Sequence, residues 1–459
     1  MAAISRFQVQ SRTAAAASRK PLILLSVLAL AVFAILVTSC GSSDEGGGAT
    51  TPGGDTTGIT DTSIKIGALV PTSGIAAIYG GAFAAGMQAY FAWLNDQGGI
   101  YGRKVDLIIQ DSQFSGPVAT EAARYLIDSQ HVFAFIGNLG DPVDSAVKQM
   151  LDEQNIPDMF LLAGAKEFVD PVQKNRFVSQ VTYETEGKIF GTYLAKQYAG
   201  KKVGIIAQND ASGKEGEAGI KEEIENEKAD VTTTTEYYDP TVTDVTAQCQ
   251  RLKGANVDAV MFYGSAMAAA SMIKTIRETL SWDVPMLMNE GAGAQMIAPL
   301  AGAANMDGMV STTIADLPSN EKTPFYTEWQ PVFEKYATNA PAGAWDAMGP
   351  TGILAGDLFA GILKLAGPDL TRESFEAAAE HVCKYQVDPS QPPSSTSPTD
   401  HSFAEAMIMT KASLDSSVKE GVVFYTFGGM ISFESTPDCS PAKMPAGAKD
   451  QPGPDLGVY

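Results

Sequence analysis

Residues that could perform catalysis or bind metal are sparse in this sequence, and their spacing matches no enzyme motif. The three histidines, His131, His381 and His401, form no zinc-binding pattern. No G-x-S-x-G nucleophile elbow occurs, and no Gly-Lys pair precedes Ser or Thr as a phosphate-binding loop requires. The sequence therefore predicts a non-enzyme without metal or cofactor. An extracellular hydrolase stays open as an alternative, because carboxylates are abundant and their proximity cannot be computed from a sequence.

The N-terminal segment, residues 1–39, is predicted to be an export signal. Its apolar run at 21–37 follows four basic residues, which are Arg6, Arg12, Arg19 and Lys20. The run ends at Val37-Thr38-Ser39-Cys40. These four residues resemble a bacterial lipobox, in which the cysteine becomes the lipidated first residue of the mature protein. An ordinary signal peptide with an incidental cysteine is the alternative.

Residues 40–60 are rich in Gly, Ser and Thr and are predicted to be a flexible tether. With a lipid on Cys40, the tether would hold the folded part at the outer face of the cytoplasmic membrane, or facing the periplasm in a two-membrane envelope. The remaining residues, about 400, are enough for two domains. The formal net charge of -21 argues against nucleic acid or an anionic lipid surface as a partner.

Three further cysteines follow Cys40. Cys383 and Cys439 lie in the loop-rich C-terminal region and are predicted to form a disulfide, whereas Cys249 is predicted to be a buried free thiol in a helix. The sequence alone does not determine this pairing. A proline- and serine-rich segment at 387–402 is predicted to loop out over the surface.

From residue 64 onward, short β-rich runs alternate with longer helical runs. The predicted strands are 64–70, 105–110, 132–137, 159–163, 203–207, 231–237, 259–263, 285–289 and 308–313. This alternation predicts an α/β fold with parallel sheets flanked by helices. Ligands of such folds bind at the carboxyl ends of the strands.

Several of these runs carry motifs of a known family. In chain order they include IKIGALVPTSGIAAIYG at 64–80, GMQAYFAWLNDQGGIYGRKVDLIIQDS at 86–112, FIGNLGDPVDSAV at 135–147 and VPMLMNEG at 284–291. The chain thereby resembles the leucine/isoleucine/valine-binding protein family, the type I periplasmic solute-binding proteins that deliver ligands to ABC importers. The resemblance weakens after residue 318.

The resemblance implies two α/β lobes that are joined by three crossovers and close on a solute in the cleft between them. It places 61–182 and 313–421 in the first lobe, and 183–312 and 422–459 in the second. It also implies a monomer that captures a small-molecule ligand for an ABC permease in the membrane. A binding protein that reports its ligand to a membrane receptor is the alternative.

The resemblance also implies ligand-binding positions. Tyr79 stands where the family has an aromatic wall, and Glu290 stands where an acid holds the ligand's ammonium group. Asp141 occupies the place of a Ser or Thr that donates to the ligand's carboxylate in amino-acid binders. An ionised aspartate would repel that carboxylate, so Asp141 argues against an ordinary α-amino acid. Capping of the helix that starts at Pro142 is the alternative role for Asp141.

The other predicted ligand contacts are Leu162, Gly164, Ser212, Tyr263, Ser265 and Trp345. Leu162 and Gly164 offer backbone groups but no hydroxyl. The two serines stand where relatives have tyrosines, with Tyr263 two positions before one of them, and this predicts a roomier and more polar cleft. We therefore expect a small polar organic solute, which is amino-acid-like, an amide, a urea-like compound or an amine.

Overall fold

The computed structural model describes residues 53–74, 76–293, 297–314, 324–386, 393–417, 422–432 and 444–456. The predicted signal peptide, the lipidation residue Cys40 and the predicted disulfide partner Cys439 lie outside these residues. Cys383 is disulfide-bonded, and Cys249 is a buried free cysteine.

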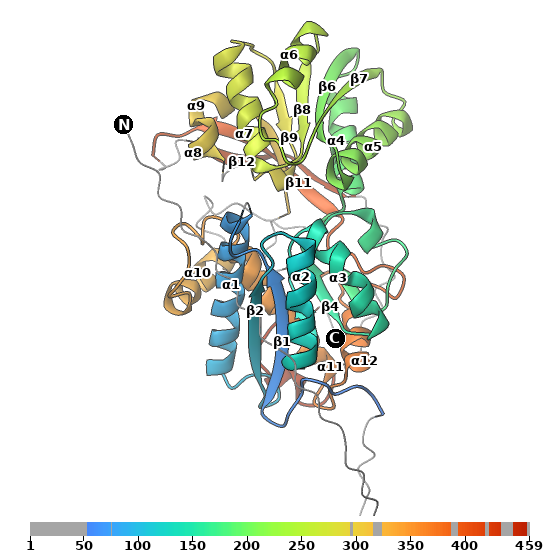
Figure 1. Cartoon of the computed structure of the whole chain (residues 1–459), viewed down its shortest axis with the longest axis vertical. Coiled ribbons are helices and arrows are strands. Elements are labelled where there is room, and N and C mark those ends of the chain that lie inside the picture. Colours follow the sequence, from blue (N-terminus) through green and yellow to red (C-terminus); the bar gives the residue numbers. More distant parts are fainter. Residues whose placement is uncertain are drawn as a thin grey trace, which may run out of the picture. The chain divides into compact units, whose positions relative to one another are not determined.

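The first lobe contains five parallel strands in the order β2-β1-β3-β4-β5 (Figure 1). Their bounds are β1 Ser63–Val70, β2 Lys104–Asp111, β3 Ala134–Ile136, β4 Asp158–Leu161 and β5 Arg176–Val178. One face packs against α1 Ala77–Asp96, α10 Pro324–Tyr336, α11 Gly349–Ala366 and α12 Arg372–Ala379. The other face packs against α2 Gly116–Arg124 and α3 Asp141–Glu153. At the end of β1, Ala68 and Val70 lie in the first of these cores and Leu69 lies in the second, as a strand buried on both faces requires.

The second lobe contains seven strands in the order β12-β11-β10-β9-β8-β6-β7. Their bounds are β6 Lys201–Gln208, β7 Val231–Tyr238, β8 Ala259–Tyr263, β9 Met286–Met288, β10 Val310–Thr313, β11 Ala406–Leu414 and β12 Val422–Ser432. Helices α4 Tyr183–Gln197 and α5 Ala211–Asn226 cover one face. The other face is covered by α6 Thr246–Gly254, α7 Ala266–Lys274, α8 Ala298–Ala301 and α9 Ala303–Met306.

From β1 to β12 the chain passes between the two sheets three times. The first crossover, residues 179–182, joins β5 to α4; the second begins at Ile314, after β10; the third leads from α12 into β11. The predicted α/β fold with flanking helices and three crossovers is thus confirmed, and its sheets are parallel except at β11 and β12, which pair antiparallel.

Two lobe boundaries differ from the prediction. β11 pairs antiparallel with β10, so 406–414 belong to the second lobe and not to the first. Leu456, predicted to lie in the second lobe, packs instead in the core of the first, where its carbonyl oxygen accepts from the Cys383 amide at 3.2 Å. Both segments are placed by partners distant in sequence, which an alternation of strands and helices does not encode.

The predicted tether also ends before residue 60. Oδ2 of Asp55 lies 2.8 Å from Nη1 of Arg372, and the Asp55 carbonyl oxygen accepts from the Arg372 amide at 2.9 Å. Ile59 forms a β-bridge with Ile64. The folded part therefore begins by Asp55, because these backbone groups are held by α12 and β1.

The proline- and serine-rich segment does not loop out as predicted in the part that the structure describes, 393–402. Thr396 is 1% exposed and His401 is 3% exposed. The amide of Val178 donates to the His401 carbonyl oxygen at 3.0 Å, and the His401 ring stacks on Phe177 with centroids 4.0 Å apart. This part of the third crossover is therefore anchored along β5.

Candidate ligand-binding site

The loops after β3 and β4 hold each other through their backbones. Leu162 donates from its amide to the Asn138 carbonyl oxygen at 2.9 Å, and its own carbonyl oxygen accepts from Gly140 at 3.1 Å. The Gly164 carbonyl oxygen accepts from the Tyr183 amide at 2.9 Å. These backbone groups of Leu162 and Gly164 were predicted to bind a ligand. In the structure they form hydrogen bonds within the protein instead.

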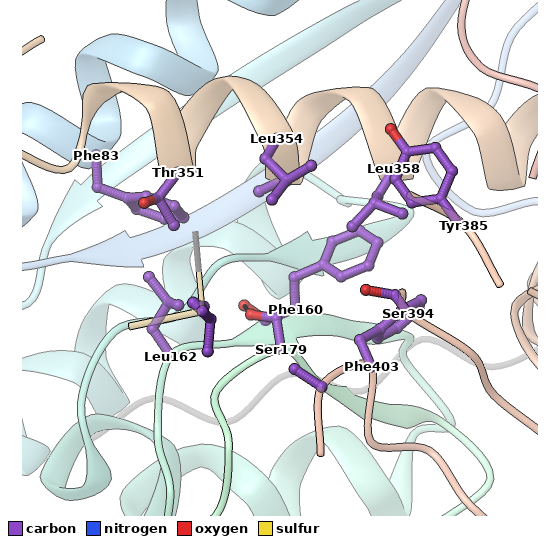
Figure 2. A pocket seen from close by; sticks show the side chains of 13 residues that line it. Phe83, Phe160, Leu162, Ser179, Thr351, Leu354, Leu358, Tyr385, Ser394 and Phe403 are labelled. Atoms are coloured by element: carbon purple, nitrogen blue, oxygen red, sulfur yellow. Dashed lines mark hydrogen bonds between the residues drawn. The ribbon is translucent and has the colours of Figure 1, made fainter. Parts of the chain in front are cut away.

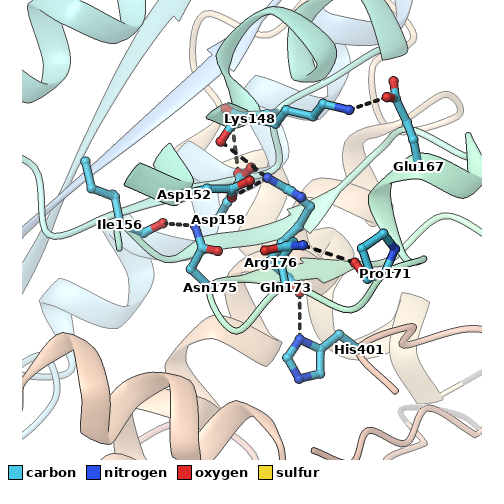
Figure 3. Close-up of polar contacts among 11 residues, drawn as sticks. Lys148, Asp152, Ile156, Asp158, Glu167, Pro171, Gln173, Asn175, Arg176 and His401 are labelled. Carbon is cyan, nitrogen blue, oxygen red and sulfur yellow. Dashed lines mark hydrogen bonds and ion pairs between the residues drawn. The ribbon is translucent and has the colours of Figure 1, made fainter. Parts of the chain in front are cut away.

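A buried polar network lies behind this pair of loops (Figure 3). The Asn138 side chain accepts from the Leu69 amide at 2.9 Å and donates to Asp158 at 2.9 Å. The guanidinium of Arg176 lies 4.0 Å from Asp158 and 2.5 Å from Asp152 on α3. Because Asn138, Asp158 and Arg176 are buried and bonded to neighbouring elements, they fix the β3–α3 loop and with it the position of Asp141.

Asp141 is the first residue of α3. The N-cap position of this helix, which was the alternative role for Asp141, is occupied by Gly140 with φ 107°. Oδ2 of Asp141 accepts a hydrogen bond from the Tyr183 hydroxyl at 2.9 Å. Its Oδ1 is buried and has no hydrogen-bond partner among the described residues. Burial raises the pKa of Asp141 to about 6, and the hydrogen bond from Tyr183 and the nearby backbone amide of Ala165 oppose that rise.

Tyr79, in the first turn of α1, has a buried hydroxyl that finds no partner within the part of the chain that the structure describes. Burial raises the pKa of Tyr79 to about 12. A buried polar atom without a partner costs free energy, so a hydrogen-bonding group from a bound solute would stabilise it. Two of the residues predicted from sequence, Tyr79 and Asp141, present such an atom.

Glu290 follows β9 and lies where two crossovers meet. Its carboxylate accepts from Gln180 Nε2 at 3.0 Å, on the first crossover, and from the Ile314 amide at 3.3 Å, on the second. Its own amide donates to Glu186 Oε1 at 2.7 Å. Burial, and then the charge of Glu186, raise the pKa of Glu290 to about 7. A carboxyl group whose pKa lies near neutral thus stands between the first and second crossovers.

The remaining predicted ligand contacts lie at helix starts, in the case of the two serines, or in packed cores, in the case of the two aromatic residues. Ser212 donates from Oγ to Asp210 at 2.8 Å in the first turn of α5, and Ser265 is the N-cap residue of α7. Tyr263 is fully buried in the core of the second lobe, where its hydroxyl donates to Glu186 at 2.5 Å. Trp345 packs in the first lobe against the rings of Tyr326 and Phe333. Tyr263 and Trp345 thus take part in packing, and their contact with a ligand stays a prediction.

A cavity that the sequence did not predict lies beside these loops (Figure 2). It is lined by Phe83, Phe160, Leu162, Ser179, Ile314, Thr351, Leu354, Ala355, Leu358, Tyr385, Ser394, Phe403 and Ala404. Of the predicted ligand contacts, Leu162 belongs to this lining. The spacing of Thr351, Leu354 and Leu358 marks one face of a helix, but such spacing indicates only burial and cannot show that the facing elements leave a space.

Nothing in the sequence pattern indicated the partners of the two acids. Tyr183 is 42 positions from Asp141, and Gln180 is 110 positions from Glu290. Among the described residues, no group of three or more His, Cys, Asp or Glu side chains could hold a metal ion. In the same part of the chain, no helix has both the length and the apolar character needed to cross a membrane.

Comparison with known proteins places these features in context. Residues 63–417 match the model of a family described as periplasmic binding protein. A Leu/Ile/Val-binding protein homolog from Brucella suis is 23% identical over 252 residues, and a leucine-, isoleucine-, valine-, threonine- and alanine-binding protein from Pseudomonas aeruginosa is 22% identical over 250 residues. Each match covers 54% of this chain and 66% of the relative.

Solved structures share the fold. A fatty acid ABC transporter substrate-binding protein from Thermomonospora curvata superposes with a TM-score of 0.68 at 21% identity, covering 81% of this chain and 94% of that one. A branched chain amino acid ABC transporter protein from Thermus thermophilus with bound valine superposes with a TM-score of 0.69 at 17% identity, covering 82% and 97%. These two proteins carry different solutes on one fold, so the fold does not name the solute.

Proposed function

This chain belongs to the periplasmic binding protein family, a family of extracytoplasmic ligand-binding proteins, and on that premise we propose that it is a lipid-anchored solute-binding protein for an ABC importer. Cys40 carries the lipid, and the chain between Cys40 and Asp55 serves as the tether. A tethered binding protein remains near its permease, which raises the effective concentration of the loaded form.

We place the solute between the first turns of α1 and α3, which carry Tyr79 and Asp141, and the crossovers that hold Glu290. The observation that carries this proposal is the pair of buried atoms, Asp141 Oδ1 and the Tyr79 hydroxyl, that have no partner among the described residues. A solute that donates hydrogen bonds would satisfy Asp141, and an ammonium or amide group would do so at the lowest electrostatic cost. The proposed solute is therefore small, polar and organic: amino-acid-like, an amide, a urea-like compound or an amine.

A thermal-shift screen tests this function on the wild type and the Asp141→Ser variant, against amino acids, amides, ureas and amines. A solute at 100 times its Kd should stabilise the wild type by about 2.7 kcal/mol. We expect amides or amines to stabilise the wild type, and zwitterionic amino acids to do so only after Asp141→Ser. Equal stabilisation of both proteins by leucine would show that Asp141 does not select the solute.

A further inference from the structure

The cavity of Figure 2 has apolar walls from three elements of the first lobe. Leu354 and Leu358 point from α11 toward Phe160 at the end of β4, and Phe83 contributes from α1. The volume is about 60 Å³, several times the roughly 10–15 Å³ that one water molecule needs. The space therefore suits a short branched alkyl group or a small ring and is too small for a long chain.

Of the four hydroxyl groups in the wall, those of Ser179 and Tyr385 are engaged elsewhere, and that of Thr351 makes only a long contact of 4.0 Å with Sδ of Met348. Ser179 donates to the carbonyl oxygens of Phe160 at 3.2 Å and Leu161 at 3.3 Å. The Tyr385 hydroxyl donates to Asp357 at 2.5 Å. The other nine lining side chains are apolar, so across most of the cavity an apolar group would be favoured over water.

The cavity also touches all three crossovers and lies next to a carboxylate. Ser179 belongs to the first crossover, Ile314 to the second, and Phe403 to the third. The Ile314 amide donates to Glu290 at 3.3 Å, and Gln180, the neighbour of Ser179 in the chain, donates to the same carboxylate at 3.0 Å. One molecule could therefore place a cationic group near Glu290 and an apolar group in the cavity.

We propose that this cavity receives the apolar part of the solute, so that the solute class is a primary amine or amide bearing a short alkyl group or a small ring. The proposal rests on the proposed function, because it assigns a second part of the same solute. An occupant would contact the segments that join the lobes, and the apolar area that it buries would then contribute directly to closure.

Isothermal titration of the full chain with methylamine, ethylamine, propylamine and isobutylamine tests the proposal. Each added methylene should tighten binding by about fourfold until the cavity is full. Leu354→Trp, which fills the cavity, should bind all four amines like methylamine. Leu300→Trp is the matched control, because Leu300 is 42% exposed on α8, and it should keep the wild-type series.

Leu354→Ala keeps the test decisive should the tryptophan variant fail to fold. It enlarges the cavity, so benzylamine should bind more tightly to this variant than to the wild type. Amines that bind with equal affinity whatever their alkyl group would overturn the cavity assignment and leave the proposed function standing. An absence of binding by every amine, amide, urea and amino acid would overturn both.

Discussion

The Tyr183 hydroxyl donates a hydrogen bond to Oδ2 of Asp141 at 2.9 Å, which joins the first residue of α4 to the first residue of α3. One helix packs on the second sheet and the other on the first. The bond therefore ties the two lobes at the edge of the proposed site. It also leaves one oxygen of the carboxylate for a solute.

The pH dependence of stability should report the burial of Asp141. Its folded pKa of about 6 lies above the ordinary 3.8, so between those values the folded protein binds a proton that the unfolded chain has lost. This contribution to the free energy of unfolding is present at low pH and is lost as the pH rises through about 6. Asp141→Asn should then stabilise the protein at pH 7.5, by at most about 3 kcal/mol, and have little effect at pH 4.

Urea denaturation of wild type and Asp141→Asn at several pH values measures this difference. Asparagine keeps an acceptor for Tyr183, so the comparison isolates the charge. Asp61→Asn, at an exposed position, is the control for the removal of one carboxylate. A constant difference between Asp141→Asn and wild type across the pH range would contradict the expectation.

The contact between α4 and α5 depends on glycine. A Cβ added at Gly187 would overlap the carbonyl oxygen of Gly216 on the facing helix, so the helices would have to separate. Gly187→Ala should therefore destabilise the protein by on the order of 1–3 kcal/mol. At Gly254, the last residue of α6, an added Cβ meets nothing within 4 Å, and Gly254→Ala should be neutral or stabilising by up to about 1 kcal/mol.

Chemical denaturation of both variants tests this prediction. Similar effects of the two substitutions would mean that helix propensity, and not the close approach of α4 to α5, governs the response.

The buried guanidinium of Arg176 should be more important than exposed ion pairs. Its side chain is 1% exposed and pairs with Asp152 and Asp158, as Figure 3 shows. Arg176→Met would leave Asp158 buried without its cation and should cost about 3–5 kcal/mol. Arg251→Met removes the pair with Glu236 from a side chain that is 51% exposed and should cost at most about 1 kcal/mol. Equal losses of stability of the two variants in thermal denaturation would contradict this prediction.

The disulfide of Cys383 should involve Cys439. Non-reducing peptide mapping by mass spectrometry should recover a Cys383–Cys439 peptide, while buried Cys249 should react with thiol reagents only after denaturation. Cys383→Ser, Cys439→Ser and the double variant should lose the same stability, about 2–5 kcal/mol, because each removes one cross-link. A Cys439→Ser variant as stable as wild type would rule out this pairing.

Local patterns in the sequence determined most of the α/β framework. Alternating strands and helices place their apolar residues at periods of two and about 3.6, and β1, β2, β3, β4, β6, β7, β8, β9 and β10 lie within or across the predicted runs. The short β5 and the hairpin of β11 and β12 were missed. β11 and β12 pair with each other without an intervening helix, so the alternating pattern did not extend to them.

The resemblance of the sequence to a known family also singled out Tyr79, Asp141 and Glu290 as ligand-binding positions. Only the tertiary structure decided what each one contacts, because Tyr183, Gln180 and Ile314 reach the two acids across the crossovers. The same holds for the apolar cavity, which exists because α11, β4 and three crossovers fail to fill the space between them. Periodicity reports which side of an element is buried, whereas pairing and voids depend on how distant elements are brought together.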